Sequence, residues 1–143
     1  DNKYRDELVE SYTNYFNILQ LPYIKSIKET VGIINNTTHS RHLYPIRVEK
    51  GLRDYVMEEL SERGIYCGVH YLDNTQYSMY NYAHGTCKNA HQISSELISL
   101  PLHLHMTHQD VKQVVLQLAD IIPDYDRVRS DKSIVKGKLG RVK

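Results

Sequence analysis

The sequence predicts a small α+β domain in which helices cover a three-stranded sheet. Apolar residues recur at helical spacing over residues 8–19 and 111–122, and a further helix is expected over 51–63. Short apolar runs at 42–48, 65–71 and 96–100 have the length of strands. The expected order is therefore helix, strand, helix, strand, loop, strand, helix, with no internal repeat.

Composition excludes several classes of protein. The chain has 143 residues, 41% of them hydrophobic, which suffices for one domain with a core. Its formal net charge of +1 gives no reason to expect that the chain as a whole binds nucleic acid or an anionic membrane. No apolar run approaches the roughly 18 residues of a spanning helix, and the start, residues 1–5, does not resemble a signal peptide. We expect the two cysteines, Cys67 and Cys87, to be free thiols of a cytoplasmic protein.

Charge concentrates at the C-terminal end. Residues 127–143 contain seven basic residues and one acidic residue and have no apolar period. We expect this segment to be a disordered, solvated tail, with nucleic-acid binding as the less favoured alternative. The folded domain is accordingly expected over residues 1–126.

The first helix is amphipathic. Leu8, Tyr12, Tyr15, Phe16 and Leu19 fall on one face, and the helix should end before Pro22. No capping residue marks its start, so residues 1–20 are expected to be a connecting helix that continues a longer element. Such a fragment should expose apolar surface and self-associate, through this helix or through the tyrosine-rich segment 77–82.

The middle of the chain alternates between expected loops and strands. Residues 24–40 are polar and aperiodic, which predicts a loop before the strand 42–48. Pro45 belongs where one backbone amide need not pair. Gly64 should end the helix 51–63, and Gly68 in the next strand indicates a close backbone approach.

The second half is expected to begin irregularly. Residues 72–91 should form a loop with a turn at His84 and Gly85. The strand 96–100 should end at Pro101. Residues 107–110 resemble a capping box that opens the last helix, and Pro123 should stop that helix.

Metal and nucleophile chemistry find little support. His103, His105 and His108 flank a strand-to-helix turn without the helical i, i+4 pair or cysteine pair of a metal site, so no metal is predicted. Neither Cys67 nor Cys87 has the glycine-rich or helix-start context that activates a thiol. No catalytic residue is assigned in this chain.

His70 and Tyr71 are the best candidates for binding. They end an expected strand just before a long aromatic-rich segment, where sheets commonly present ligand-binding groups. Histidine can hydrogen-bond a sugar hydroxyl or a phosphate, and tyrosine can stack and donate a hydrogen bond. The alternative is an edge histidine beside a core tyrosine.

Five stretches together resemble a known family. They are residues 38–48, the pair Arg53–Asp54, residues 63–71, residues 93–103, and Met106–Thr107 before a valine-rich helix. In this order and spacing they resemble the C-terminal (small) domain of the DegT/DnrJ/StrS nucleotide-sugar aminotransferases, which are fold type I pyridoxal-phosphate enzymes. The resemblance covers roughly residues 1–122.

The resemblance implies an amino transfer from glutamate to a nucleotide-linked keto sugar. The enzyme is expected to be a cytoplasmic homo-oligomer, namely a dimer. The lysine that holds pyridoxal phosphate belongs to the family's larger N-terminal domain, and no lysine of this chain stands in the matching context. The isolated chain is therefore expected to be inactive and to bind no cofactor. His70, Tyr71, His42 and Tyr44 match family positions near the bound nucleotide sugar.

One segment departs from the family pattern. The family follows its Val-His-Tyr with a proline-containing segment and a second histidine, whereas this chain has residues 72–76 without proline and Gln76 near the expected histidine. This departure favours an alternative hypothesis, a non-catalytic remnant that acts as a binding or interaction module.

Overall fold

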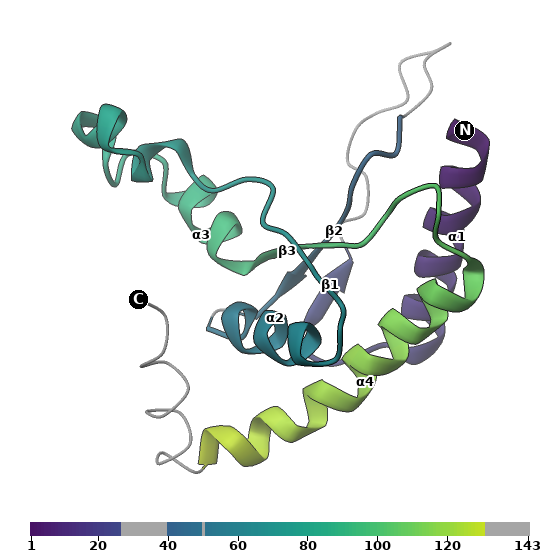
Figure 1. Ribbon diagram of the computed structural model, residues 1–143. Coiled ribbons are helices and arrows are strands. Elements are labelled where there is room, and N and C mark those ends of the chain that lie inside the picture. The colour runs from purple at the N-terminus through teal and green to yellow at the C-terminus, as the bar shows by residue number, and fades with distance from the viewer. Residues whose placement is uncertain (27–39, 50, 131–143) are drawn as a thin grey trace.

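The computed structural model describes residues 1–26, 40–49 and 51–130 (Figure 1). The helices and strands follow the chain in the order α1 (Asn2–Leu19), β1 (Ile24–Ser26), β2 (Tyr44–Val48), α2 (Arg53–Glu62), the 3-10 helices η1 (Asn74–Gln76) and η2 (Ser78–Ala83), α3 (Lys88–Glu96), β3 (Leu97–Leu100) and α4 (His108–Ser130). An α+β domain with a small sheet is thus confirmed.

The sheet has three antiparallel strands in the order β1-β2-β3. Between β1 and β2 Ile24 pairs with Val48, and between β2 and β3 Tyr44 pairs with Leu100. Two of the three expected strands are confirmed as β2 and β3. The remaining strand of the sheet, β1, was not expected: it lies at the start of the segment 24–40, which was predicted to be a loop.

The expected strand 65–71 is wrong, because only Gly68 pairs, in an isolated bridge to Ser99. The antiparallel register explains why the ladder stops there. The next pair on one side would need a backbone N–H from Pro101, which has none. On the other side Leu97 follows directly on the end of α3.

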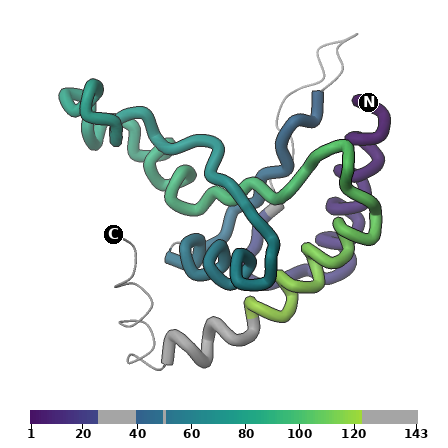
Figure 2. The backbone as a smooth tube through the Cα atoms, in the orientation of Figure 1, coloured from purple at the N-terminus to yellow at the C-terminus, as the bar shows by residue number. Residues whose placement is uncertain are grey.

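The core lies between one face of the sheet and the helices α1, α2 and α4. Figure 2 shows α1 and α4 running side by side, and their contacts confirm it. Tyr44, Ile46 and Val48 are buried toward the helices, while the alternate residues Pro45 and Arg47 are half-buried on the opposite face.

The apolar face of α1 belongs to this core. Leu8, Tyr12 and Phe16 are buried, and the Tyr12 ring stacks on Tyr44 with 4.6 Å between centroids. The Tyr12 hydroxyl donates a hydrogen bond to the Pro101 carbonyl at 2.9 Å. The domain itself covers most of this face, which leaves the tyrosine-rich segment 77–82 as the better-exposed of the two expected contacts; self-association itself stays a prediction.

Three helix ends follow their sequence signals: the end of α1, the end of α2 and the start of α4. Gln20 caps α1 in a left-handed conformation before Pro22. Gly64, with φ of 77°, follows α2, and the Ile65 N–H reaches back to the Leu60 carbonyl as in a Schellman motif. Thr107 and Asp110 form the expected reciprocal cap of α4, with bonds of 2.7 to 3.2 Å.

Two expectations fail in the second half of the chain. The helix α4 continues through Pro123 to Ser130, so that 127–130, expected to be tail, are helical; residues 131–143 lie outside the described part. Residues 88–91, the start of α3, were expected to be irregular, and Glu96 at its end was expected to begin a strand. The buried residues of α3 are the polar Ser94 and Glu96, so no buried apolar face marks this helix.

Residues 72–96 form an extension that we call the arm. It contains η1, η2 and α3, and Figure 1 shows it projecting from the sheet away from α1. A turn at residues 84–86 joins η2 to α3, as expected for His84 and Gly85. None of the helices in the described ranges has the length and apolarity to cross a lipid bilayer.

Candidate functional site

His70 and Tyr71 lie where the chain leaves the sheet for the arm. Tyr71 is 68% exposed and His70 is half-buried, and their rings meet edge to face with centroids 5.2 Å apart. The peptide bond between them is cis. An exposed tyrosine beside a partly buried histidine offers an aromatic face and one ring nitrogen, Nε2, to a ligand.

Gly68 makes room for the His70 ring. A Cβ atom at position 68 would lie only 2.4 Å from Cε1 of that ring. A close backbone approach was expected at Gly68, but the group that approaches it is the His70 side chain. Nδ1 of His70 is buried there without a hydrogen-bond partner in the described part of the chain.

A cavity of about 460 Å³ opens beside Tyr71, between residues 71–75 and α3. Leu72, Ile93 and Leu97 contribute apolar side chains, and Asn74 and Ser94 add an amide and a hydroxyl. Its remaining lining residues are Asp73, Thr75, Cys87 and Ala90. No basic residue lines the cavity in the described part of the chain, so this hollow suits an uncharged group better than a phosphate.

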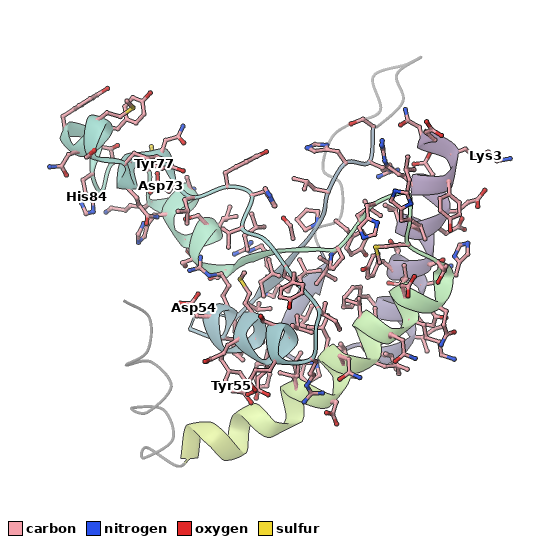
Figure 3. The ribbon with its side chains drawn as sticks, viewed as in Figure 1. Lys3, Asp54, Tyr55, Asp73, Tyr77 and His84 are labelled. Atoms are coloured by element: carbon pink, nitrogen blue, oxygen red, sulfur yellow. The ribbon has the colours of Figure 1, made fainter. Side chains whose placement is uncertain are left out.

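The carboxylate of Asp73 holds the arm's first turn rather than facing a ligand. It accepts hydrogen bonds from the Thr75 N–H at 2.9 Å and the Thr75 hydroxyl at 2.8 Å, with His91 Nδ1 at 3.4 Å. The bonds from Thr75 lower the pKa of Asp73. Figure 3 labels Asp73, Tyr77 and His84, which lie along the arm.

The structure separates the other two predicted site residues from this pair. Tyr44 lies in the core, where its hydroxyl is 3.3 Å from the Thr13 hydroxyl, and it is on the face of the sheet opposite to Ser99 and the His70 ring. His42 is exposed just before β2. In the described ranges no ring contact or hydrogen bond joins either residue to His70 or Tyr71.

Sequence reasoning missed the contribution of α3. Ser94 and Ile93 line the cavity only because residues 88–96 are helical. The one available signal was that residues 93–96 fall in a stretch that resembles the family.

The described histidines do not form a metal site. No group of three or more His, Cys, Asp or Glu side chains gathers within the described ranges. The His103 and His105 rings lie 6.2 Å apart, whereas His108 Nδ1 is bonded to the Ser11 hydroxyl at 2.7 Å.

The described residues do not fit a covalent pyridoxal-phosphate site. Such a site needs a lysine in a partly enclosed pocket. The four lysines of the described ranges, Lys3, Lys25, Lys88 and Lys112, are all exposed, and none lines the cavity. We therefore derive no reaction step through that cofactor on these residues.

Comparison with known proteins identifies the family. The sequence model of the DegT/DnrJ/EryC1/StrS aminotransferase family matches residues 1–119. The chain belongs to this family.

Individual relatives agree with this assignment. The uncharacterized protein MJ1066 of Methanocaldococcus jannaschii is 29% identical over 130 residues, which is 85% of this chain and 32% of that protein. A Helicobacter pylori enzyme, UDP-4-amino-4,6-dideoxy-N-acetyl-β-L-altrosamine transaminase, is 32% identical over 80 residues, 52% of this chain and 21% of that enzyme. The chain thus spans at most about a third of the length of the curated relatives it matches.

Solved structures share the fold. The aminotransferase TlmJ from Streptoalloteichus hindustanus superposes with a TM-score of 0.76 at 22% identity, over 87% of this chain and 32% of TlmJ. Helicobacter pylori PseC, an aminotransferase of pseudaminic acid biosynthesis, gives 0.72 at 25% identity, over 86% of this chain and 33% of PseC. The fold is that of one part of the fold type I sugar aminotransferases.

Proposed function

We propose that this chain is the small domain of a pyridoxal-phosphate-dependent nucleotide-sugar aminotransferase, which transfers an amino group from glutamate to a keto sugar nucleotide. The family match over residues 1–119 carries the proposal. The Helicobacter pylori relative that acts on a UDP-linked amino sugar supports the substrate class.

The cofactor belongs to the whole protein in this proposal. The Streptococcus pneumoniae sugar aminotransferase Spr1654, a structural neighbour, is known in a PLP form and a PMP form. Pyridoxal phosphate supplies the amino-carrying chemistry in such enzymes. Since the described lysines are exposed, the covalent lysine is proposed to lie outside the described residues of this chain.

His70 and Tyr71 are proposed to contact the nucleotide sugar. His70 would hydrogen-bond a sugar hydroxyl or a phosphate oxygen, while the exposed Tyr71 ring packs against the sugar. The cavity beside Tyr71 offers apolar surface with an amide and a hydroxyl, which suits an uncharged sugar or base. For Tyr44 and His42 a role at the nucleotide sugar stays a prediction that rests on the resemblance alone.

The site can be tested on the chain itself. UDP-N-acetylglucosamine serves as the probe, and heteronuclear NMR reports which backbone amides shift on titration. We expect the largest shifts at His70, Tyr71 and the cavity, and we expect His70→Ala to weaken binding while the melting temperature stays within a few degrees. His84→Ala, an exposed histidine on the arm, is the matched control. Equal binding by the His70 and His84 variants would refute the assignment of His70.

The same proposal includes a homo-oligomer in the cytoplasm. Both cysteines are unpaired, which fits a reducing compartment. Fractionation of cells that carry a tagged chain tests the location.

A non-catalytic binding module is the second candidate. Gln76 favours it, because it stands near the position of the family's second histidine; in the structure its amide is 3.5 Å from the Ser94 hydroxyl. The complete gene product, assayed with pyridoxal phosphate, glutamate and a UDP-linked keto sugar, separates the two. Transamination supports the enzyme, and probe binding without transamination supports the module.

A further inference from the structure

Two buried polar atoms in the described part of the chain lack a hydrogen-bond partner: Nδ1 of His70 and the hydroxyl oxygen of Ser99. Ser99 is only 3% exposed. Leaving a buried donor or acceptor unbonded costs free energy, and nearly all such atoms in native proteins are paired. Both atoms therefore call for a partner.

The backbone places these two side chains next to each other. Gly68 and Ser99 exchange two hydrogen bonds, of 3.1 and 2.7 Å, which makes them directly opposed residues of an antiparallel pair. Side chains of opposed residues project from the same face, with Cβ atoms about 4.5–5.5 Å apart. Because Gly68 has no side chain, the His70 ring fills that place: its Nδ1 lies 3.1 Å from where a Cβ of residue 68 would be.

We propose that Ser99 is a positioning residue for His70, and that its hydroxyl donates a hydrogen bond to Nδ1. In this proposal a rotation about the Cα–Cβ bond of Ser99 brings the hydroxyl within hydrogen-bond distance of Nδ1. Which of the two atoms donates follows from asking which arrangement leaves neither the Ser99 hydroxyl nor Nδ1 without a partner. If Nδ1 carried the proton and donated it, the Ser99 proton would still lack an acceptor, whereas donation from Ser99 satisfies both atoms.

This bond has a consequence for the ring. With Nδ1 as acceptor, the neutral imidazole carries its proton on Nε2, and the ring is held in one orientation over Gly68. His70 would then present an N–H donor to a ligand oxygen. That last step rests on the proposed function, but the hydrogen bond itself does not.

The bond is tested by long-range ¹H–¹⁵N NMR of the His70 ring in the chain without ligand. In the wild type we expect a protonated Nε2 and an Nδ1 resonance displaced in the direction of a hydrogen-bonded acceptor. Ser99→Ala should return Nδ1 to the position of an unbonded nitrogen, and Ser99→Thr, which keeps the hydroxyl, should restore it. Ser95→Ala is the control, because the Ser95 hydroxyl is bonded to the Gln92 carbonyl.

Two results would overturn the proposal. One is a wild-type ring protonated on Nδ1, which needs no variant and so holds even if a substituted chain fails to fold. The other is an Nδ1 resonance that is the same in the wild type and in Ser99→Ala.

A second measurement connects Ser99 to binding. Ser99→Ala should weaken binding of UDP-N-acetylglucosamine by about 3–10-fold, the worth of one hydrogen bond, and should have no further effect in a His70→Ala background. If the ring resonances respond to Ser99 but the probe does not bind, the proposed substrate fails and the role of Ser99 stands. If the probe binds through His70 but the ring resonances do not change in Ser99→Ala, the proposed substrate stands and the role of Ser99 fails.

Discussion

The guanidinium of Arg47 holds the carboxylate of Glu96: its Nε and Nη2 lie 3.1 Å and 2.5 Å from Oε2. Arg47 projects from β2 on the face opposite the core, and Glu96 is the last residue of α3, only 7% exposed. Gln92 binds the other carboxylate oxygen at 3.2 Å. The Arg53 Nη1 adds a hydrogen bond of 2.7 Å to the Ser94 carbonyl. The end of the arm is thus tied to the sheet by Arg47 of β2 and to the helix α2 by its first residue, Arg53.

Arg47→Ala should lower the free energy of unfolding by about 1–3 kcal/mol, because it leaves the buried Glu96 carboxylate without its charged partner. Chemical denaturation measures the loss. Arg63→Ala, which breaks an exposed pair with Asp120, is the control and should cost less than about 1 kcal/mol. Equal losses in the two variants would contradict a tie through Arg47.

Stability should fall as the pH is lowered below about 4. Burial alone would raise the pKa of Glu96, but hydrogen bonds from Arg47 and Gln92 and nearby positive charge outweigh it, and the pKa is lowered. Hydrogen bonds from Thr75 and Thr107 lower the pKa values of Asp73 and Asp110. A lowered folded-state pKa gives stability that is complete above the unfolded-state pKa and is lost as the pH falls through the folded-state pKa.

The measurement is the melting temperature between pH 2 and pH 6. We expect it to fall as the pH is lowered below about 4. Glu96→Gln should flatten this fall, at some cost in stability at pH 6. A slope that is the same in Glu96→Gln as in the wild type would show that this carboxyl does not contribute.

Gly68→Ala should displace the His70 ring with little damage to the fold. The new methyl group would lie 2.4 Å from Cε1, and a side chain at the protein edge can move more easily than backbone. We expect altered His70 ring resonances and weaker probe binding with a nearly unchanged melting temperature. Gly85→Ala is an instructive comparison: its φ of 79° strains any other residue, but the glycine lies in the turn of the arm, away from His70. A His70 ring unaffected by Gly68→Ala would contradict the packing described above.

Self-association, if it occurs, should depend on the arm and not on α1. Met79 and Tyr82 of η2 are exposed, Tyr82 to 85%. Replacing both by serine should lower the associated fraction in sedimentation at several concentrations, without a change in melting temperature. Phe16→Glu should instead unfold the domain, by placing a charge in the core at a cost of about 3 kcal/mol or more. Association that survives the double serine change would place the contact elsewhere.

Pyridoxal phosphate with borohydride should label no single lysine of this chain. The lysines of the described ranges are exposed, and exposed lysines react slowly and without selection, because no enclosing pocket orients the aldehyde. Mass spectrometry of the digest detects the adducts. A stoichiometric adduct at one lysine would overturn this expectation.

The parts of the fold that sequence predicts well are those set by local chemistry. The Thr107–Asp110 cap, the glycine after α2 and the buried stripes of α1 and α4 each depend on residues a few positions apart. His70 and Tyr71 are predicted as binding residues from their place at the end of an expected strand, of which the structure keeps only the bridge between Gly68 and Ser99.

The failures depend on contacts between distant residues. The buried residues of α3 are the polar Ser94 and Glu96, and its end is held by hydrogen bonds from Arg47 to the Glu96 carboxylate and from Arg53 to the Ser94 carbonyl. Tyr44 has the sequence of a strand-end binding residue, and only the stacking partners Tyr12 and Phe16 show that it belongs to the core. Pro123 was expected to stop α4, but a missing N–H does not prevent a helix from continuing with one bond fewer.

The two cysteines differ in a way that is useful for measurement. Burial raises the pKa of the Cys67 thiol to about 11, so at neutral pH it stays protonated and reacts slowly with maleimides or iodoacetamide. Cys87 is exposed and stands on the wall of the cavity beside Tyr71. A fluorophore should therefore attach to Cys87 alone in the unmodified sequence. Its emission would then report on occupancy of that cavity in real time, without any engineered labelling position.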